Sequence, residues 1–194
     1  MKKYELTSNM KEIAGHKLFQ IKALKDFSDV KAGDLGGYIE KEENLSHDGN
    51  AWVYDKACVF ENARIYDDAW ICGDAKVFGN ARIYGDAWVY DNAQVYANAE
   101  VHGNANINGN AGICVNAQVL SDADYICFKG FGSENRNTTM FKAKNGDVMV
   151  KCGCFVNNLK KFEEKVKETH GSSIYAKEYL ACVEVAKIHF QIKD

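Results

Sequence analysis

Small and apolar residues recur every six positions through the middle of the chain. Alanine occupies every sixth position from Ala51 to Ala123, and a Val or Ile lies two residues after each alanine as far as Val119. A period of six suits no amphipathic α-helix, whose apolar stripe follows a period of 3.6 residues. It suits a short strand followed by a tight corner, with each apolar residue buried against the next repeat. The pattern therefore predicts a solenoid over residues 51–125.

The polar positions between the apolar ones are suited to tight corners. Pairs such as Gly79-Asn80, Gly85-Asp86 and Gly103-Asn104 separate successive strands. Gly, Asn and Asp tolerate the left-handed backbone conformation that such corners need, and alanine leaves room inside them.

These six-residue units resemble a known repeat. Residues 95–100 (VYANAE) and 83–88 (IYGDAW) resemble the hexapeptide of left-handed β-helix proteins, with an aliphatic residue first and a small residue fifth. In that family three hexapeptides form one triangular coil, so residues 18 apart stack at strand spacing, roughly 4.8 Å. The resemblance implies a mainly β fold built on a left-handed parallel β-helix. It says much less about function, because one fold serves many functions.

Such stacking would place outward side chains in columns of every eighteenth residue. All three tryptophans, Trp52, Trp70 and Trp88, fall in one column. An exterior this aromatic usually marks an interface. We interpret this tryptophan face as a contact with another subunit or with the chain's own terminal segments; the alternative is a binding surface for a planar ligand.

Two further columns suit a nucleotide-like ligand. Tyr54 and Tyr90 lie two coils apart with the smaller Cys72 between them. A nucleobase could enter that gap, where stacking contributes about 1–3 kcal/mol per base. Arg64 and Arg82 could hold a phosphate, although stacking on the tyrosines of the neighbouring column also explains them.

The first 50 residues lie outside the regular repeat. Residues 17–24 alternate partly and predict a strand, and residues 31–39 predict a loop leading onto a first coil. We expect residues 1–50 to form a β cap over the open end of the β-helix, whose exposed edge would otherwise invite aggregation.

After Tyr125 the period disappears, and residues 126–194 predict a separate module. Asn145-Gly146 between two apolar runs predicts a hairpin. Asn158 can cap one helix that ends at Gly171, and Ser172 or Ser173 can start a second. We therefore expect a C-terminal ββαα (α+β) module.

Both ends also resemble phage-associated proteins. Gly132-Ser133, Thr138-Thr139, residues 152–155 (CGCF) and His170-Gly171 resemble a small domain that recurs in phage and prophage proteins. Residues 4–7 (YELT) and 32–39 (AGDLGGYI) resemble phage-associated hexapeptide proteins that are often labelled transferases. The resemblance implies a viral origin without supplying a mechanism.

A catalytic alternative depends on one histidine. Many left-handed β-helix proteins are acyltransferases with a catalytic histidine near a subunit junction, and His102 is the only outward histidine of the regular repeats. The resemblance thus implies His102 as a general base. The unbroken repeats of residues 51–125 lack the loop excursions that usually build the acceptor pocket.

Two motifs in the tail are weaker. Residues 130–139, with Arg136, could cradle a phosphate through backbone amides, but they lack the lysine and following helix of a P-loop. Cys152 and Cys154 share one face of a predicted strand, and a metal would need two further ligands. We expect a polar connecting loop and reduced thiols, with no metal and no cofactor.

Composition narrows the functional class. Hydrophobic residues make up 46% of the 194 and charged residues 26%, an ordinary globular balance. The net charge of −3 divides into −1 for residues 1–50, −6 for 51–124 and +4 for 125–194. The acidic middle does not suit duplex nucleic acid. No secretory signal or membrane-spanning run occurs, so we expect a cytoplasmic protein.

These patterns lead to one hypothesis and two alternatives. The hypothesis is a phage-type, non-catalytic, oligomeric (dimeric or trimeric) binding protein that acts on a host component in an anti-defence role. That component is a host protein or a small nucleotide-like molecule that the protein sequesters. The alternatives are an acyltransferase using His102 and a structural phage component. The candidate ligand-binding residues are Trp52, Trp70, Trp88, Tyr54, Tyr90, Arg64, Arg82 and Arg136.

Overall fold

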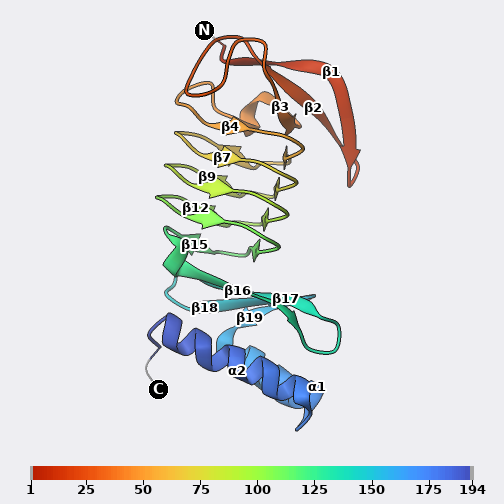
Figure 1. Cartoon of the computed structure of the whole chain (residues 1–194), viewed down its shortest axis with the longest axis vertical. Coiled ribbons are helices and arrows are strands. Elements are labelled where there is room, and N and C mark those ends of the chain that lie inside the picture. The colour runs from red at the N-terminus through yellow and green to blue at the C-terminus, as the bar shows by residue number, and fades with distance from the viewer. Residues whose placement is uncertain (1, 193–194) are drawn as a thin grey trace.

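The computed structural model describes residues 2–192 and shows an elongated column of stacked coils (Figure 1). An N-terminal hairpin lies at one end and two helices lie at the other. The hairpin comprises β1 (Tyr4–Ile13) and β2 (His16–Ala23), followed by β3 (Leu35–Ile39). The short strands of the repeat are β4 (Trp52–Val53), β5 (Cys58–Val59), β6 (Arg64–Ile65), β7 (Trp70–Ile71), β8 (Lys76–Val77), β9 (Arg82–Ile83), β10 (Trp88–Val89), β11 (Gln94–Val95), β12 (Glu100–Val101), β13 (Asn106–Ile107), β14 (Gly112–Ile113) and β15 (Gln118–Val119).

The short strands form three parallel stacks, which confirms the parallel β-helix. One stack has the order β13-β10-β7-β4, the second β15-β12-β9-β6, and the third continues from β3 through β5, β8 and β11 to β14. Every pairing between short strands joins residues 18 apart, as in Trp52 with Trp70 and Arg64 with Arg82. Parallel stacking begins before the regular repeat, because Ile39 pairs with Val59.

The interior is a column of alanine, valine and isoleucine. Ala81, Ile83 and Val101 are fully buried, as are their equivalents in neighbouring coils. Burial of a Val or Ile side chain contributes about 1.5–3 kcal/mol, so each added coil stabilises the one before it.

At several corners an acidic residue lies one coil before a glycine. Asp55 Oδ2 accepts a hydrogen bond of 3.0 Å from the amide of Gly73, 18 residues on, and Glu61 accepts one of 2.7 Å from Gly79. Both glycines have positive φ, and a Cβ on Gly79 would lie 2.7 Å from the backbone nitrogen of Ala97. Glycine therefore gives the close approach between coils, and the acid above it satisfies its amide.

The N-terminal segment covers the first coil, as the sequence predicted. Lys3 is buried and its ammonium donates to Ala51 O at 2.8 Å, while Tyr4 Oη donates to Leu45 O at 2.7 Å. Burial, with the nearby charge of Lys25, lowers the pKa of Lys3 to about 8. The exposed edge of the stack is thus occupied by the chain itself.

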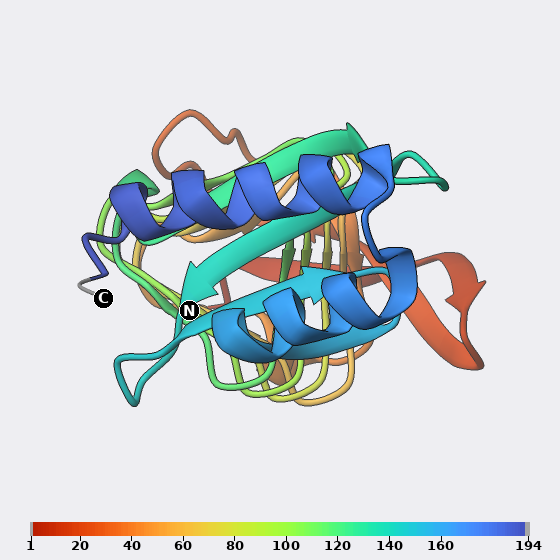
Figure 2. The same ribbon diagram turned by 90° about the horizontal axis from the view of Figure 1, so that it is seen from below.

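The C-terminal module has two more strands than the predicted ββαα arrangement. The predicted hairpin is present as β17 (Arg136–Lys142) and β18 (Val148–Cys152), flanked by β16 (Tyr125–Phe131) and β19 (Phe155–Asn158) in one antiparallel sheet. The helices α1 (Leu159–His170) and α2 (Ile174–His189) lie side by side over this sheet (Figure 2). β16 starts where the hexapeptide period ends, and β19 is only four residues long, so neither has a distinct periodicity.

Candidate functional site

The tryptophan column is divided between core and surface. Trp52 is 1% exposed and packs edge-on against Phe27, with ring centroids 5.3 Å apart, and against Tyr4 at 6.1 Å. Trp70 and Trp88 stack at 5.1 Å, and Trp88 is 43% exposed. Contact with the chain's own N-terminal segment, one of the two packing alternatives, therefore accounts for Trp52.

The two tyrosines on either side of the predicted gap, Tyr54 and Tyr90, both make hydrogen bonds within the chain. Tyr54 Oη donates to Asp29 at 2.8 Å, and its ring lies 5.3 Å from that of Trp70. Tyr90 Oη accepts a hydrogen bond of 3.0 Å from Asn108. The loop that carries Asp29 gives no sequence signal for this contact, because the two residues are 25 positions apart.

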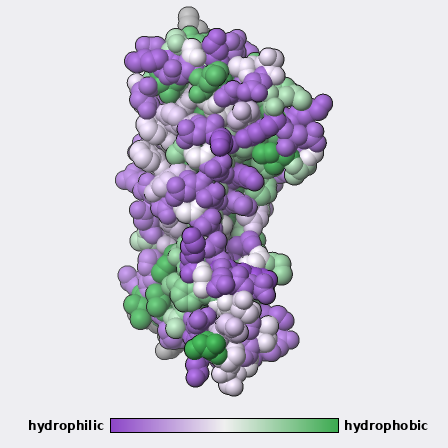
Figure 3. All heavy atoms as spheres, turned by 45° about the vertical axis from the view of Figure 1, so that its right-hand side comes forward, coloured by the Kyte–Doolittle hydropathy of each residue, from purple (hydrophilic) through white to green (hydrophobic). Residues whose placement is uncertain are grey.

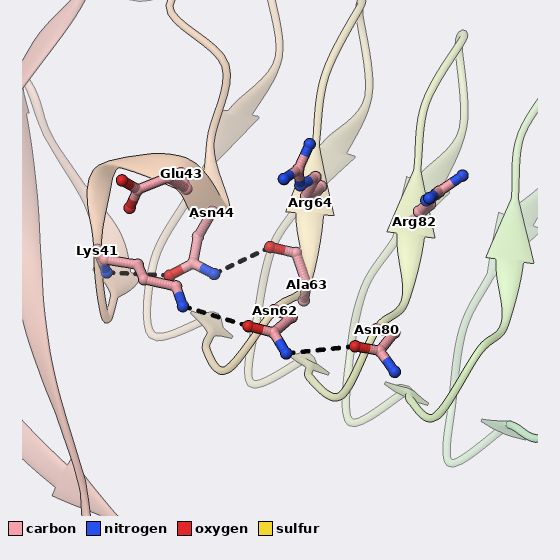
Figure 4. A pocket seen from close by; sticks show the side chains of 8 residues that line it. All are labelled: Lys41, Glu43, Asn44, Asn62, Ala63, Arg64, Asn80 and Arg82. Atoms are coloured by element: carbon pink, nitrogen blue, oxygen red, sulfur yellow. Dashed lines mark hydrogen bonds between the residues drawn. The ribbon is translucent and has the colours of Figure 1, made fainter.

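An open groove of the β-helix lies along two arginines. Arg64 and Arg82 occupy equivalent positions on β6 and β9, and both side chains project from the surface (Figure 4). A groove of about 400 Å³ runs beside them, hereafter the arginine groove. Its lining consists of Lys41, Glu43, Asn44, Asn62, Ala63, Arg64, Asn80 and Arg82.

Asparagines form one wall of the arginine groove. The amide of Asn62 donates to Asn80 at 3.3 Å, and Lys41 Nζ donates to Asn62 at 3.3 Å (Figure 4). Asn44 is buried and donates to Ala63 O at 2.9 Å. This hydrogen bond fixes the Asn44 side chain at one end of the groove. The sequence reasoning missed this wall, although asparagine recurs at positions 62, 80, 98 and 116, 18 residues apart.

The charges along the groove are only partly compensated. Arg82 lies 3.7 Å from Glu100, whose carboxylate is also 2.8 Å from Lys144. The side chain of Arg64 has no ion pair or hydrogen bond with any residue in the range 2–192. Like charges on neighbouring coils repel each other, and an anion bound between them would offset that repulsion.

The arginines do not stack on the tyrosines beside them. The cation–ring contacts within residues 2–192 involve Lys3 and Lys11 instead. Tyr66 and Tyr84 stack on each other at 4.9 Å with an interplanar angle of 5°. Tyr66 also lines a second hollow of about 460 Å³ that shares Arg64 and Arg82 with the arginine groove. Ring stacking therefore does not engage either guanidinium group, and only that of Arg82 has an acidic partner, Glu100.

His102 continues the tyrosine stack. Its ring lies 4.6 Å from Tyr84 at an angle of 2°, and its Nε2 is shielded from solvent with no hydrogen-bond partner among residues 2–192. Glu100, on the same strand, pairs with Lys144 and Arg82. A general base needs an accessible nitrogen and an orienting partner, and this geometry provides neither at Nε2.

The remaining sequence candidates lie outside the arginine groove. Arg136 is exposed at the start of β17, in the C-terminal module. Cys152 is buried and accepts a hydrogen bond from Thr138, whereas Cys154 is exposed. Across residues 2–192, no three His, Cys, Asp or Glu side chains gather in a way that could hold a metal ion.

Hydrophobic residues gather at the two ends of the face shown in Figure 3, and the stacked coils between them are mostly hydrophilic. None of the helices within residues 2–192 is long and apolar enough to cross a membrane.

Comparison with known proteins gives one partial similarity. No family model matches the chain. A stretch of 67 residues is 39% identical to the "Uncharacterized acetyltransferase YdcK" of Escherichia coli, which corresponds to 30% of this chain and 21% of that protein. The stacked parallel strands and the six-residue period fit a hexapeptide-repeat β-helix. The match spans about a fifth of the relative's length.

Proposed function

We propose that this chain is a non-catalytic binding protein that captures a small, anionic, nucleotide-like molecule in the arginine groove. The observation that carries the proposal is the pairing of Arg64 and Arg82 in register over an open groove, with Arg64 lacking an anionic partner within residues 2–192. A planar guanidinium matches phosphate oxygens in bidentate fashion, which makes arginine the usual residue for phosphate recognition.

The rest of the groove suits the body of such a ligand. The amides of Asn62 and Asn80 offer neutral hydrogen-bonding groups along one wall. Tyr66 is the first ring of its stack and lines the second hollow. The stacked coils place the two arginines in register, so the backbone of the site needs little ordering when a ligand binds.

The biological setting that we propose is viral. The resemblance of both chain ends to phage-associated proteins supports a protein that acts in the host cytoplasm and removes a nucleotide-like signal from host defence. Such removal is stoichiometric, so it requires tight binding and not turnover. We further propose a homo-oligomer, because Trp88 leaves an aromatic surface 43% exposed on the β-helix.

The test is mass spectrometry of small molecules released when the protein, purified from infected cells, is denatured. We expect an anionic, phosphate-bearing ligand that is stoichiometric with the chain. Arg64→Gln and Arg82→Gln should each weaken its binding by roughly 10- to 100-fold, because a charge-assisted hydrogen bond contributes about 1.5–3 kcal/mol.

Lys76→Gln, on the neighbouring β8 strand of another stack, is the matched control and should retain the ligand. A folded protein that releases no ligand, or whose ligand is retained by both arginine variants, would rule out the arginine groove as the binding site.

The similarity to YdcK supports acetyl transfer as a second candidate. In that case His102 would need to expose Nε2 during the reaction, for example by rotation away from Tyr84. Acetyl-CoA turnover that is lost in His102→Ala and kept in Arg64→Gln would establish catalysis. Absence of turnover with amine and hydroxyl acceptors, in protein shown to be folded, would leave the binding function.

A further inference from the structure

A separate pocket lies where the β-helix meets the C-terminal module. It has a volume of about 380 Å³, and we call it the junction pocket. The β-helix supplies one wall through β11 and β14, and β17 and β18 supply the other. Its lining consists of Gln94, Tyr96, Asn110, Ala111, Gly112, Asn135, Arg136, Asn137, Thr139, Lys151 and Gly153.

The lining of the junction pocket includes two cationic side chains, Arg136 and Lys151, and no acidic one. Lys151 Nζ donates to Gly153 O, and the guanidinium of Arg136 lies against the same glycine, where a Cβ would come within 2.3 Å of its Nη1. The side chain of Arg136 makes no hydrogen bond or ion pair with any residue in the range 2–192. Its donors therefore remain open beside a second positive charge.

The pocket is open because one column of side chains ends in glycine. Cys58, Lys76 and Gln94 occupy successive coils, and Gly112 follows them in register. Gly112 does not have a positive φ, and a Cβ there would make an ordinary contact of 3.4 Å with Lys151 Cγ. The backbone thus does not require glycine at this position. What the glycine provides is space beside the two cations.

The walls of the pocket are fixed before any ligand arrives. The amide of Gly112 donates to Thr139 Oγ1 at 3.0 Å, which joins the β-helix to β17. The Tyr96 ring stacks on Phe78 at 4.9 Å. Burial, together with a hydrogen bond to Cys114, raises the pKa of the Tyr96 hydroxyl, so it stays neutral. A preformed pocket of this kind binds with little loss of side-chain freedom.

We propose that the junction pocket is a binding site for a phosphate group carried by a small polar molecule. Arg136 and Lys151 hold the phosphate oxygens, and the amides of Gln94, Asn110 and Asn137 contact the polar body. The site shares no residue with the arginine groove and does not depend on the function proposed there. Arg136 would then bind an anion in a pocket formed by two chain segments, and not through its own loop alone.

The experiment is a titration of the uniformly ¹⁵N-labelled full chain with inorganic phosphate at constant ionic strength, followed through backbone amide shifts. We expect saturable shifts at Gly112 and Gly153, the two glycines at the pocket walls. Arg136→Gln should raise the phosphate dissociation constant at least tenfold, because it removes a charge-assisted hydrogen bond. Lys151→Gln should also weaken binding.

Gly112→Gln tests the shape of the pocket independently of charge. Glutamine occupies the same column one coil earlier, at Gln94, so the variant should fold and fill the cavity. We expect it to abolish the shift at Gly153, while Arg64→Gln in the other groove leaves that shift unchanged.

Non-saturable or absent shifts at both glycines would overturn the proposal. So would an unchanged response in folded Arg136→Gln and Lys151→Gln. If Gly112→Gln fails to fold, those two charge variants alone decide the outcome.

Discussion

Replacing each end of the tryptophan column with alanine should have very different effects on stability. Trp52 is 1% exposed and links the cap to the first coil through Tyr4 and Phe27. Truncation of a buried Trp usually lowers the free energy of unfolding by about 3–5 kcal/mol, because it removes buried surface and leaves a cavity. We therefore expect Trp52→Ala to lower the free energy of unfolding by about 3–5 kcal/mol.

Trp88→Ala is the matched control, with the same chemistry at an equivalent position two coils away. Its indole is 43% exposed, stacks on one face only against Trp70, and pairs in register with Asn106 on the other side. No enclosed cavity forms when it is removed, so the free energy of unfolding should fall by less than about 1.5 kcal/mol.

The assay is urea denaturation followed by far-ultraviolet circular dichroism, which does not depend on tryptophan fluorescence. The difference in stability follows from the shift of the midpoint at constant denaturant slope. Amide hydrogen exchange adds a local readout, because Trp52→Ala should also accelerate exchange in β1 and β2. Equal losses in the two variants, or a loss below about 1 kcal/mol in Trp52→Ala, would refute the assignment of Trp52 to the core of the cap.

Three further predictions concern the coils and the junction. Gly79→Ala should destabilise the fold by about 1–3 kcal/mol in thermal or urea unfolding, because its Cβ would lie 2.7 Å from Ala97 N at a φ of +71°. Ile83→Ala should lower the free energy of unfolding by about 2–5 kcal/mol, since Ile83 is fully buried. Burial opposes ionisation of Asp124, but its hydrogen bond from Lys142 and others hold the pKa below the ordinary 3.8. Because the pKa is lowered in the folded state, ionised Asp124 stabilises the fold above pH 3.8, and this stabilisation is lost as the pH falls through the folded pKa. Asp124→Asn should therefore lower the free energy of unfolding at neutral pH. In an acid titration the difference in stability between the variant and the original protein should shrink as the pH falls.

Much of the β-helix could be predicted because its information is local and repeated. A six-residue period with alanine and a β-branched residue specifies strand, corner and inward face, and an 18-residue coil then places Arg64 beside Arg82. The sequence therefore predicted that the two arginines of the arginine groove lie side by side. Its asparagine wall obeys the same spacing, but asparagine also suits the tight corners of every coil, so the column by itself does not indicate a site.

The tertiary structure decided which columns are covered. Sequence equivalence makes Trp52 and Trp88 look alike, but only Trp52 meets Tyr4 and Phe27, which arrive from a segment outside the repeat. The placement of Arg136 and Gly112 in one pocket is of the same kind. Periodicity determines how a coil stacks on its neighbour. Contacts between segments of different pattern depend on how the cap and the C-terminal module dock, and no local pattern encodes that geometry.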